Sequence, residues 1–191
     1  MKVLVLNGSV KGDNALKIVH EIIVDVLEDN GCDIDSLILH EIEIASCLGC
    51  FGCWVKTPGI CVINDEGRDI AKAVVQSNLL IFLTPVIFGG YSSELKKALD
   101  RLIPILSPFF EKIEGEIHHQ RRYDQYPRLI GVGVLPNKDE KSEQIFNTLI
   151  HRNAINMHSP SYASGVVYSN QEADEIRKNI QRFLAKVGVG K

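Results

Sequence analysis

Short apolar runs and amphipathic repeats alternate along this chain. Residues 2–6 form an apolar run that stops at Asn7-Gly8-Ser9. From Ala15 onwards, apolar residues recur at the three- and four-residue spacing of a helix with one buried face. Asn30-Gly31 is typical of a helix end, and residues 34–39 then predict a second strand. The chain therefore opens as strand, helix and strand.

The same alternation continues along the chain. Further strands are expected at 79–83, 129–135 and 162–167, and further helices at 65–76, 95–103, 139–152 and 173–184. The run at 79–83 is apolar throughout, which indicates a strand buried on both faces in the centre of a parallel sheet. Pro104 is expected to end or kink the helix before it, and Ser169-Asn170-Gln171-Glu172 fits a capping box for the last helix. Residues 108–127 lack clear periodicity and are predicted to be a long surface excursion, partly helical.

Five strands separated by helices predict an α/β protein with right-handed crossovers. At this length, the expected architecture is a three-layer flavodoxin-like fold with a five-stranded parallel sheet in the order 2-1-3-4-5. Ligands of such sheets bind at the carboxyl ends of the strands, where the crossovers diverge to opposite faces. The loops at 7–14 and 84–92 are therefore expected to carry the chemistry.

Composition narrows the class of protein. The 191 residues fit one domain, 1–191, and 45% apolar with 24% charged residues is an ordinary globular composition. The net charge of −3 favours neither nucleic acid nor an anionic membrane as a partner. The apolar runs are too short for a signal peptide or for the roughly 20 residues that span a bilayer, so a cytoplasmic protein without membrane contact is expected.

The first loop has the composition of an anion site. Residues 7–14 combine two glycines, Ser9, Lys11 and the capping side chains of Asp13 and Asn14 immediately before a helix, whose N-terminus has free N–H groups. A tight strand-to-helix turn with an N-cap explains the same residues equally well. The Gly-Lys-Ser/Thr of a P-loop is absent, and Gly131-Val132-Gly133 lacks the third glycine of a dinucleotide fingerprint.

The second loop is apolar where a surface loop is usually polar. It reads Thr84, Pro85, Val86, Ile87, Phe88, Gly89, Gly90, Tyr91, Ser92. A flavin ring fits such a loop, since its faces are apolar and its edge needs the backbone groups that a glycine-rich turn presents. Alternatively, the apolar side chains of this loop simply pack under the next helix.

Four of the five cysteines lie within residues 47–61. Cys47, Cys50 and Cys53 are separated by two residues each, and Cys61 follows after seven more. Overlapping gaps of this kind suit an iron–sulfur cluster better than structural zinc, which usually uses two separated Cys-x-x-Cys pairs. A compact loop in which free thiols act as small apolar residues is the third interpretation.

Together these three segments resemble the NAD(P)H-dependent FMN reductases of the flavodoxin-like superfamily, especially the branch that includes the iron–sulfur flavoproteins. The resemblance covers roughly the first hundred residues. It implies that the FMN phosphate binds at Ser9, Lys11 and Asn14 and that 84–89 wraps the isoalloxazine ring. The family usually places Ser-Asn-Thr where this chain has Asn14-Ala15-Leu16, so Asp13, Asn14 and backbone N–H groups are expected to compensate.

The leading hypothesis is an oxidoreductase that moves hydride from NADH or NADPH to FMN and passes electrons to a second acceptor: a quinone, an azo or nitro compound, free flavin or a protein. Hydride transfer demands no acid or base, so no catalytic side chain is assigned. The alternative is an electron carrier with a [4Fe–4S] cluster on the four clustered thiols. A receiver-type regulator is disfavoured because Asn7 and Thr84 replace the acidic residues it needs. The resemblance also implies a homodimer or a dimer of dimers, with a surface around Trp54 and after Pro104.

Overall fold

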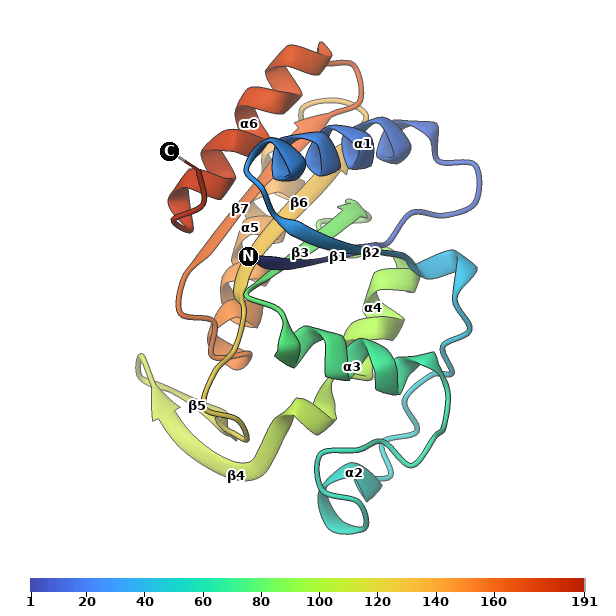
Figure 1. Ribbon diagram of the computed structural model, residues 1–191, viewed down its shortest axis with the longest axis vertical. Helices are drawn as coiled ribbons and strands as arrows, with labels where there is room; N and C mark the ends of the chain where they lie inside the picture. Colours follow the sequence, from blue (N-terminus) through green and yellow to red (C-terminus); the bar gives the residue numbers. More distant parts are fainter. Residues whose placement is uncertain (191) are drawn as a thin grey trace.

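A five-stranded sheet with helices on both faces forms the body of the protein (Figure 1). The computed structural model describes residues 1–190. The elements in chain order are β1 (Lys2–Asn7), α1 (Asn14–Asp29), β2 (Asp33–Ile38), η1 (Leu39–Glu41), α2 (Gly52–Val55), α3 (Glu66–Gln76), β3 (Leu79–Pro85), α4 (Ser93–Asp100), η2 (Ile103–Ile105), β4 (Leu106–Ile113), β5 (Glu116–Arg121), β6 (Arg128–Leu135), α5 (Glu140–Asn156), β7 (Tyr162–Tyr168) and α6 (Ala173–Lys186).

The main sheet is parallel, with the strand order β2-β1-β3-β6-β7. Because β4 and β5 form a separate sheet, β6 and β7 are the fourth and fifth strands of the main one. The predicted flavodoxin-like order 2-1-3-4-5 is therefore confirmed. In this order β1 and β3 are neighbours, and their carboxyl ends bring the two candidate loops to one edge.

Two hydrophobic cores lie on opposite faces of the sheet. Val3 and Val5 of β1 face the core that α1 and α6 cover, whereas Leu4 and Leu6 face the core covered by α3, α4 and α5. This alternation follows from the two-residue period of a strand. The sheet is thus buried on both faces, as the unbroken apolar run in β3 predicts.

The glycines of β6 are explained by helix packing. A Cβ on Gly131 would lie 2.3 Å from Ile150 of α5, and one on Gly133 would lie 2.5 Å from Val86. These positions therefore admit no larger side chain. Packing alone explains the Gly-x-Gly pattern inside this strand, and no nucleotide-binding role is needed.

Three local predictions were wrong. Residues 108–127 are not partly helical: β4 and β5 form an antiparallel hairpin that extends from the body (Figure 1). Pro104 neither ends nor kinks the preceding helix, because α4 already ends at Asp100 and Pro104 lies in η2. The last helix has no capping box, because its N-cap is Glu172, while the Gln171 side chain accepts a hydrogen bond from the Tyr168 N–H.

No helix within residues 1–190 has both the length and the apolar character needed to cross a membrane.

Candidate functional site

The loop after β1 approaches β3 so closely that one position must be glycine. The Gly8 N–H donates to the Leu83 carbonyl at 2.7 Å. A Cβ on Gly8 would lie 2.7 Å from Ser92 Oγ and 2.8 Å from Leu95 Cβ. Both distances are shorter than real Cβ contacts, so any larger residue would separate the loop from the start of α4.

Ser92 joins the two candidate loops. Its hydroxyl donates to the Gly8 carbonyl at 2.6 Å, and its N–H donates to Thr84 Oγ1 at 3.0 Å. The same hydroxyl caps α4 by accepting from the Leu95 N–H at 3.2 Å. The loops at 7–14 and 84–92 therefore lie side by side at the carboxyl edge of the sheet, as the fold predicts.

The first loop is built around the start of α1. The Ser9 N–H donates to the buried side chain of Asn7 at 2.9 Å, which fixes the entry to the loop. Asp13 caps the helix, because its carboxylate accepts from the Leu16 N–H at 3.0 Å. Ser9 is buried, whereas Lys11 and Asn14 are exposed. The loop thus has the anion-site geometry of a capped helix N-terminus, and the capping explanation of Asp13 holds as well.

A cavity of about 320 Å³ lies beside this loop, between α1 and the end of β2. Its lining includes the predicted residues Ser9, Asp13 and Asn14, but not Lys11. It also includes Lys17 and His40, which the sequence reasoning missed, and His20, whose ring hydrogen-bonds to Ser36 and, among the described residues, not to the loop. Lys17 follows Asn14 at helical spacing, so it could have been found from the predicted helix, whereas His40 joins the site through a contact with Ser9 that no periodic pattern signals. Burial lowers the pKa of His20, whose Nε2 lies 2.7 Å from Ser36 Oγ.

The second loop divides into a buried base and an exposed tip. Thr84 is fully buried, and Val86 packs against β6 and donates to the Val134 carbonyl at 2.9 Å. Ile87 and Gly90 then exchange backbone hydrogen bonds of 3.0 and 2.8 Å, which makes a tight turn. For Val86, packing under the neighbouring elements is therefore the correct explanation, but it does not extend to the tip.

The tip of this turn is Phe88, which is 98% exposed and has a φ of +49°. A positive φ strains any residue other than glycine, and an exposed aromatic ring gains nothing from burial in return. Gly89 follows at φ +80° and lies so close to Ile145 that a Cβ would approach it to 2.6 Å. The chain thus holds an apolar ring outward at the carboxyl edge of β3, as expected where a flat apolar ligand or a partner covers it.

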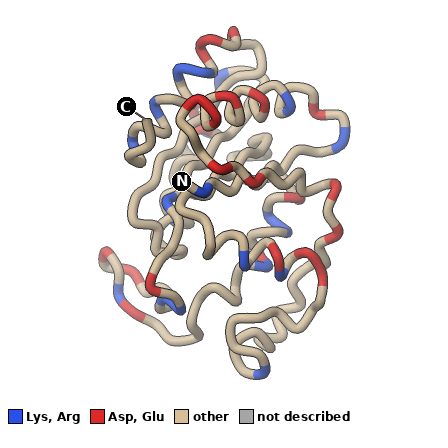
Figure 2. The backbone as a smooth tube through the Cα atoms, viewed as in Figure 1, with Lys and Arg blue, Asp and Glu red and all other residues tan. Residues whose placement is uncertain are grey.

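The cysteine loop, residues 46–64, carries the four clustered thiols. Lys56 is its one charged residue, and Figure 2 shows the loop almost without charge. Cys53 is buried, Cys50 is exposed, and Cys47 and Cys61 are half-buried. Burial raises the pKa of the Cys53 thiol, and the neighbouring thiols of Cys61, Cys47 and Cys50 raise it further.

The four thiols do not form a ready ligand set. Within residues 1–190, no three side chains of histidine, cysteine, aspartate or glutamate are arranged to hold one metal ion. The Gly49 N–H does lie 3.5 Å from Cys47 Sγ, which is the one thiol–backbone hydrogen bond of this loop among these residues. The assignment of Cys47, Cys50, Cys53 and Cys61 as metal ligands stays a prediction.

The hairpin packs against the cysteine loop through Trp54. The indole N–H donates to the Leu106 carbonyl at 3.0 Å. Its ring lies 4.8 Å from His119 of β5 and 5.2 Å from Phe51, and His119 in turn lies 4.6 Å from Phe110 of β4. Residues 111–127, which the sequence left unexplained, therefore support the loop that holds the thiols.

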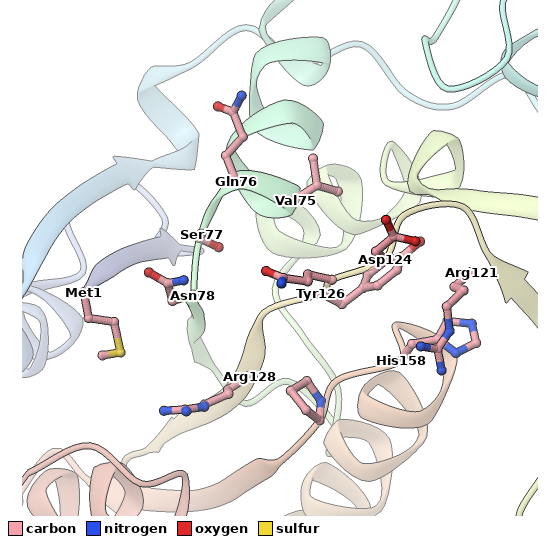
Figure 3. Close-up of a pocket in the computed structure, with 12 residues that line it drawn as sticks. Met1, Val75, Gln76, Ser77, Asn78, Arg121, Asp124, Tyr126, Arg128 and His158 are labelled. Carbon is pink, nitrogen blue, oxygen red and sulfur yellow. The ribbon is translucent and has the colours of Figure 1, made fainter.

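A second cavity, larger than the one beside the first loop, does not coincide with either candidate loop. It measures about 620 Å³ and lies at the amino ends of the central strands, where Figure 3 shows Asn78, Tyr126, Arg128 and His158 on its walls. None of the residues predicted to bind FMN or a metal lines it. The candidate site at the carboxyl edge is therefore identified by its chemistry and not by its size.

Known proteins resemble this chain in sequence and in fold. A sequence profile of the NADPH-dependent FMN reductases matches residues 1–123, which include both candidate loops and the cysteine loop. The chain belongs to this family. The match ends just after β5, so β6 to α6 lie outside it.

Two curated relatives of this FMN reductase family member are named iron-sulfur flavoprotein. One, from Methanocaldococcus jannaschii, is 30% identical over 105 residues, which is 55% of this chain and 53% of the relative. The other, from Methanosarcina thermophila, is 30% identical over 104 residues, 54% of this chain and 53% of the relative. Each match spans about half the length of the curated relative.

Solved structures with the same fold cover nearly the whole chain. An NAD(P)H:quinone oxidoreductase from Methanothermobacter marburgensis superposes with a TM-score of 0.70 at 12% identity, covering 100% of this chain and 98% of the other. An FMN-dependent NADH-azoreductase from Bacillus anthracis, solved in complex with FMN, gives 0.67 at 14% identity, covering 95% and 98%. At these identities the likeness establishes the flavodoxin-like fold.

Proposed function

We propose that this chain is an FMN-dependent oxidoreductase that accepts hydride from NADH or NADPH and delivers electrons to a second acceptor in a separate step. The observation that carries the proposal is the joining of the two loops by Ser92, which hydrogen-bonds to Gly8 and to Thr84 at once. An anion-binding loop and an exposed apolar turn are thereby held next to each other. FMN has a matching pair of ends, a phosphate and a flat ring.

The phosphate end belongs at the first loop. Ser9 offers a hydroxyl, α1 offers the positive end of its dipole, and Lys11 and Lys17 add positive charge nearby. Asn14 lines the same cavity. Asp13 is a carboxylate used for capping, so its contribution is to present the helix N–H groups and not to touch the phosphate.

The ring end belongs at the second loop. When bound, FMN supplies the hydride-accepting centre, and the residues of the chain bind and orient it. Thr84 and Pro85 end β3 beneath the turn, while Ile87 and Phe88 form its outer surface and Gly89 is buried behind them. Covering the strained, exposed Phe88 would remove apolar area from water, which favours binding of a flat aromatic ligand.

The acceptor is proposed by class. The solved structures of the same fold include a quinone oxidoreductase and azoreductases, so quinones and azo compounds come before nitro compounds, free flavin and proteins. The nicotinamide must reduce the flavin, and the same flavin must then reduce the acceptor, so one face of the ring has to stay open. An exposed loop tip leaves such a face available.

A visible absorption spectrum of anaerobically purified protein, taken before and after addition of FMN, tests the proposal. Flavin bands that alter on binding, together with NADH or NADPH oxidation that depends on a quinone or azo dye, are the expected result. Protein that neither contains nor takes up FMN would overturn it. Iron and sulfide, determined on the same sample, test the second candidate function, which is an electron carrier with an iron–sulfur cluster.

The second candidate is an electron carrier with a [4Fe–4S] cluster. It is favoured by the spacing of Cys47, Cys50, Cys53 and Cys61 and by relatives named iron-sulfur flavoprotein. The thiols as they stand do not converge, so the cysteine loop would have to close around a cluster. Stoichiometric iron that is lost in Cys53→Ser, while FMN binding remains, supports this candidate. Iron-free anaerobic protein with full flavin contradicts it.

A homodimer or a dimer of dimers is the proposed assembly. The cysteine loop and the hairpin expose eight large apolar side chains: Leu48, Phe51, Val55, Ile60, Val62, Phe109, Phe110 and Ile117. Exposed apolar side chains in such number on two packed segments are typical of an interface. Light scattering of the FMN-loaded protein is expected to give a dimer or tetramer mass, and a strict monomer with full flavin would contradict the assembly.

A further inference from the structure

His40 contacts the first loop from the segment that follows β2. It follows β2 in η1, and its Nδ1 lies 3.0 Å from the Ser9 carbonyl oxygen and 3.3 Å from Ser9 Oγ. Ser9 itself is only 6% exposed, so this contact is shielded from water. The imidazole thus holds the residue on which the predicted phosphate site is centred.

The carbonyl oxygen of Ser9 determines which nitrogen of the His40 ring carries a hydrogen. A carbonyl oxygen can only accept, so the 3.0 Å contact places a hydrogen on His40 Nδ1. Ser9 Oγ, which faces the same N–H, is then also an acceptor toward the ring. The hydrogen of the Ser9 hydroxyl consequently remains available for another acceptor.

The orientation of the Ser9 carbonyl also fixes the next N–H. In a planar trans peptide the C=O and N–H vectors point in opposite directions. Because the Ser9 carbonyl faces His40, the Val10 N–H points away from the ring. Within residues 1–190 the backbone N–H groups of Val10, Lys11 and Gly12 find no backbone acceptor, whereas those of Asp13 and Asn14 do.

We propose that His40 is a positioning residue of the FMN phosphate site, which turns the Ser9–Val10 peptide so that the N–H groups of residues 10–12 and the Ser9 hydroxyl face the phosphate. This role rests on the proposed FMN function. Ser9 is the one hydroxyl residue in 9–16, so backbone donors must supply most of the hydrogen bonds that an anion needs there. The orientation of the Ser9–Val10 peptide therefore has a large effect on phosphate binding.

His20 provides a matched comparison. It lines the same cavity, but its Nε2 lies 2.7 Å from Ser36 Oγ, with no bond to the first loop among the described residues. A substitution there changes the cavity wall without freeing the Ser9 peptide. His20→Gln is accordingly the control variant for His40.

The experiment compares FMN with riboflavin, which has the same ring and lacks the phosphate. Dissociation constants are measured by flavin fluorescence for wild type, His40→Leu, His40→Asn and His20→Gln. His40→Leu is expected to weaken FMN about tenfold or more and to leave riboflavin within about twofold, since only phosphate hydrogen bonds are lost. His40→Asn, whose amide N–H can replace Nδ1–H, is expected to recover most of the affinity, and His20→Gln is expected to keep the FMN-over-riboflavin ratio.

Each other outcome counts against the role. An equal loss of FMN and riboflavin in His40→Leu, or an unchanged preference for FMN, overturns it while the FMN function stands. Wild-type protein that does not bind FMN overturns the function and the role together. Should His40→Leu not fold, amide NMR of the wild type decides: FMN, compared with riboflavin, must shift the Val10, Lys11 and Gly12 N–H signals, and their constancy overturns the role.

Discussion

The Arg101 guanidinium donates to both oxygens of the Asp65 carboxylate, at 2.6 and 2.7 Å, and closes the base of the cysteine loop. Arg101 is only 1% exposed and also donates to the Ala45 carbonyl at 2.7 Å, while the Ala45 N–H donates to Asp65 at 2.8 Å. Residues on either side of the loop are thereby joined through one ion pair. The loop that carries the four thiols is therefore anchored to α3 and α4, whatever it holds.

Asp65→Asn tests this anchor. Hydrogen bonding from Arg101 holds the pKa of the Asp65 carboxyl below its ordinary value, despite the opposing effect of burial. The pair therefore stabilises the fold above the pKa of an unfolded aspartate, about 3.9, and the stabilisation is lost as the pH falls toward the lower folded value. Removing the charge leaves Arg101 buried and unpaired, which should cost about 3 kcal/mol at pH 7.

Urea unfolding at pH 7 and at pH 3.5 measures both effects. The difference between wild type and Asp65→Asn should shrink at the lower pH. Lys96→Ala is the control, because it breaks the exposed Lys96–Asp100 pair and should cost less than about 1 kcal/mol. Equal losses in the two variants would mean that the buried pair does not anchor the loop.

Gly8→Ala should abolish the coupling of the two candidate loops. Its Cβ would meet Ser92 Oγ and Leu95 Cβ, both on or beside the start of α4, so the first loop must move away from the second. FMN affinity should fall at least about tenfold, because phosphate and ring sites would no longer match one ligand. Gly31→Ala, in a remote turn with φ +66° and open space, should reduce stability by about 1 kcal/mol without changing FMN affinity.

The placement of these loops could be predicted from sequence, and their side-chain partners could not. The unbroken apolar run of β3 and the crossovers determine the strand order, which brings Gly8 next to Leu83. His40 was missed because its importance comes from a contact across 31 residues, and a lone histidine after a strand has no periodic signal. The hairpin was missed for a similar reason, since its strands carry polar residues on both faces and pack on Trp54 rather than on the sheet.

Ser9→Asp should repel the phosphate. A carboxylate about 4 Å from a phosphate at an effective dielectric constant near 20 costs about 4 kcal/mol per pair of unit charges, so FMN affinity should fall by about two orders of magnitude or more. Riboflavin affinity should change far less. Ser9→Ala, which removes the hydroxyl without adding charge, should produce a smaller loss. Equilibrium dialysis of both ligands distinguishes these results, and undiminished FMN binding by Ser9→Asp would place the phosphate elsewhere.

Phe88→Gly should make the protein more stable and a weaker flavin binder. Phe88 has a φ of +49° and is almost fully exposed, so glycine relieves the strain of about 1 kcal/mol or more and loses no packing in the apoprotein. Glu114→Gly is the matched control, because Glu114 has the same kind of backbone at φ +50° but lies in the hairpin turn. Both variants should raise the midpoint of thermal unfolding of the apoprotein, and only Phe88→Gly should weaken FMN and riboflavin together, because the ring site is affected and the phosphate site is not. A loss confined to FMN would instead place Phe88 near the phosphate, and no loss of either ligand would separate the strained tip from flavin binding altogether.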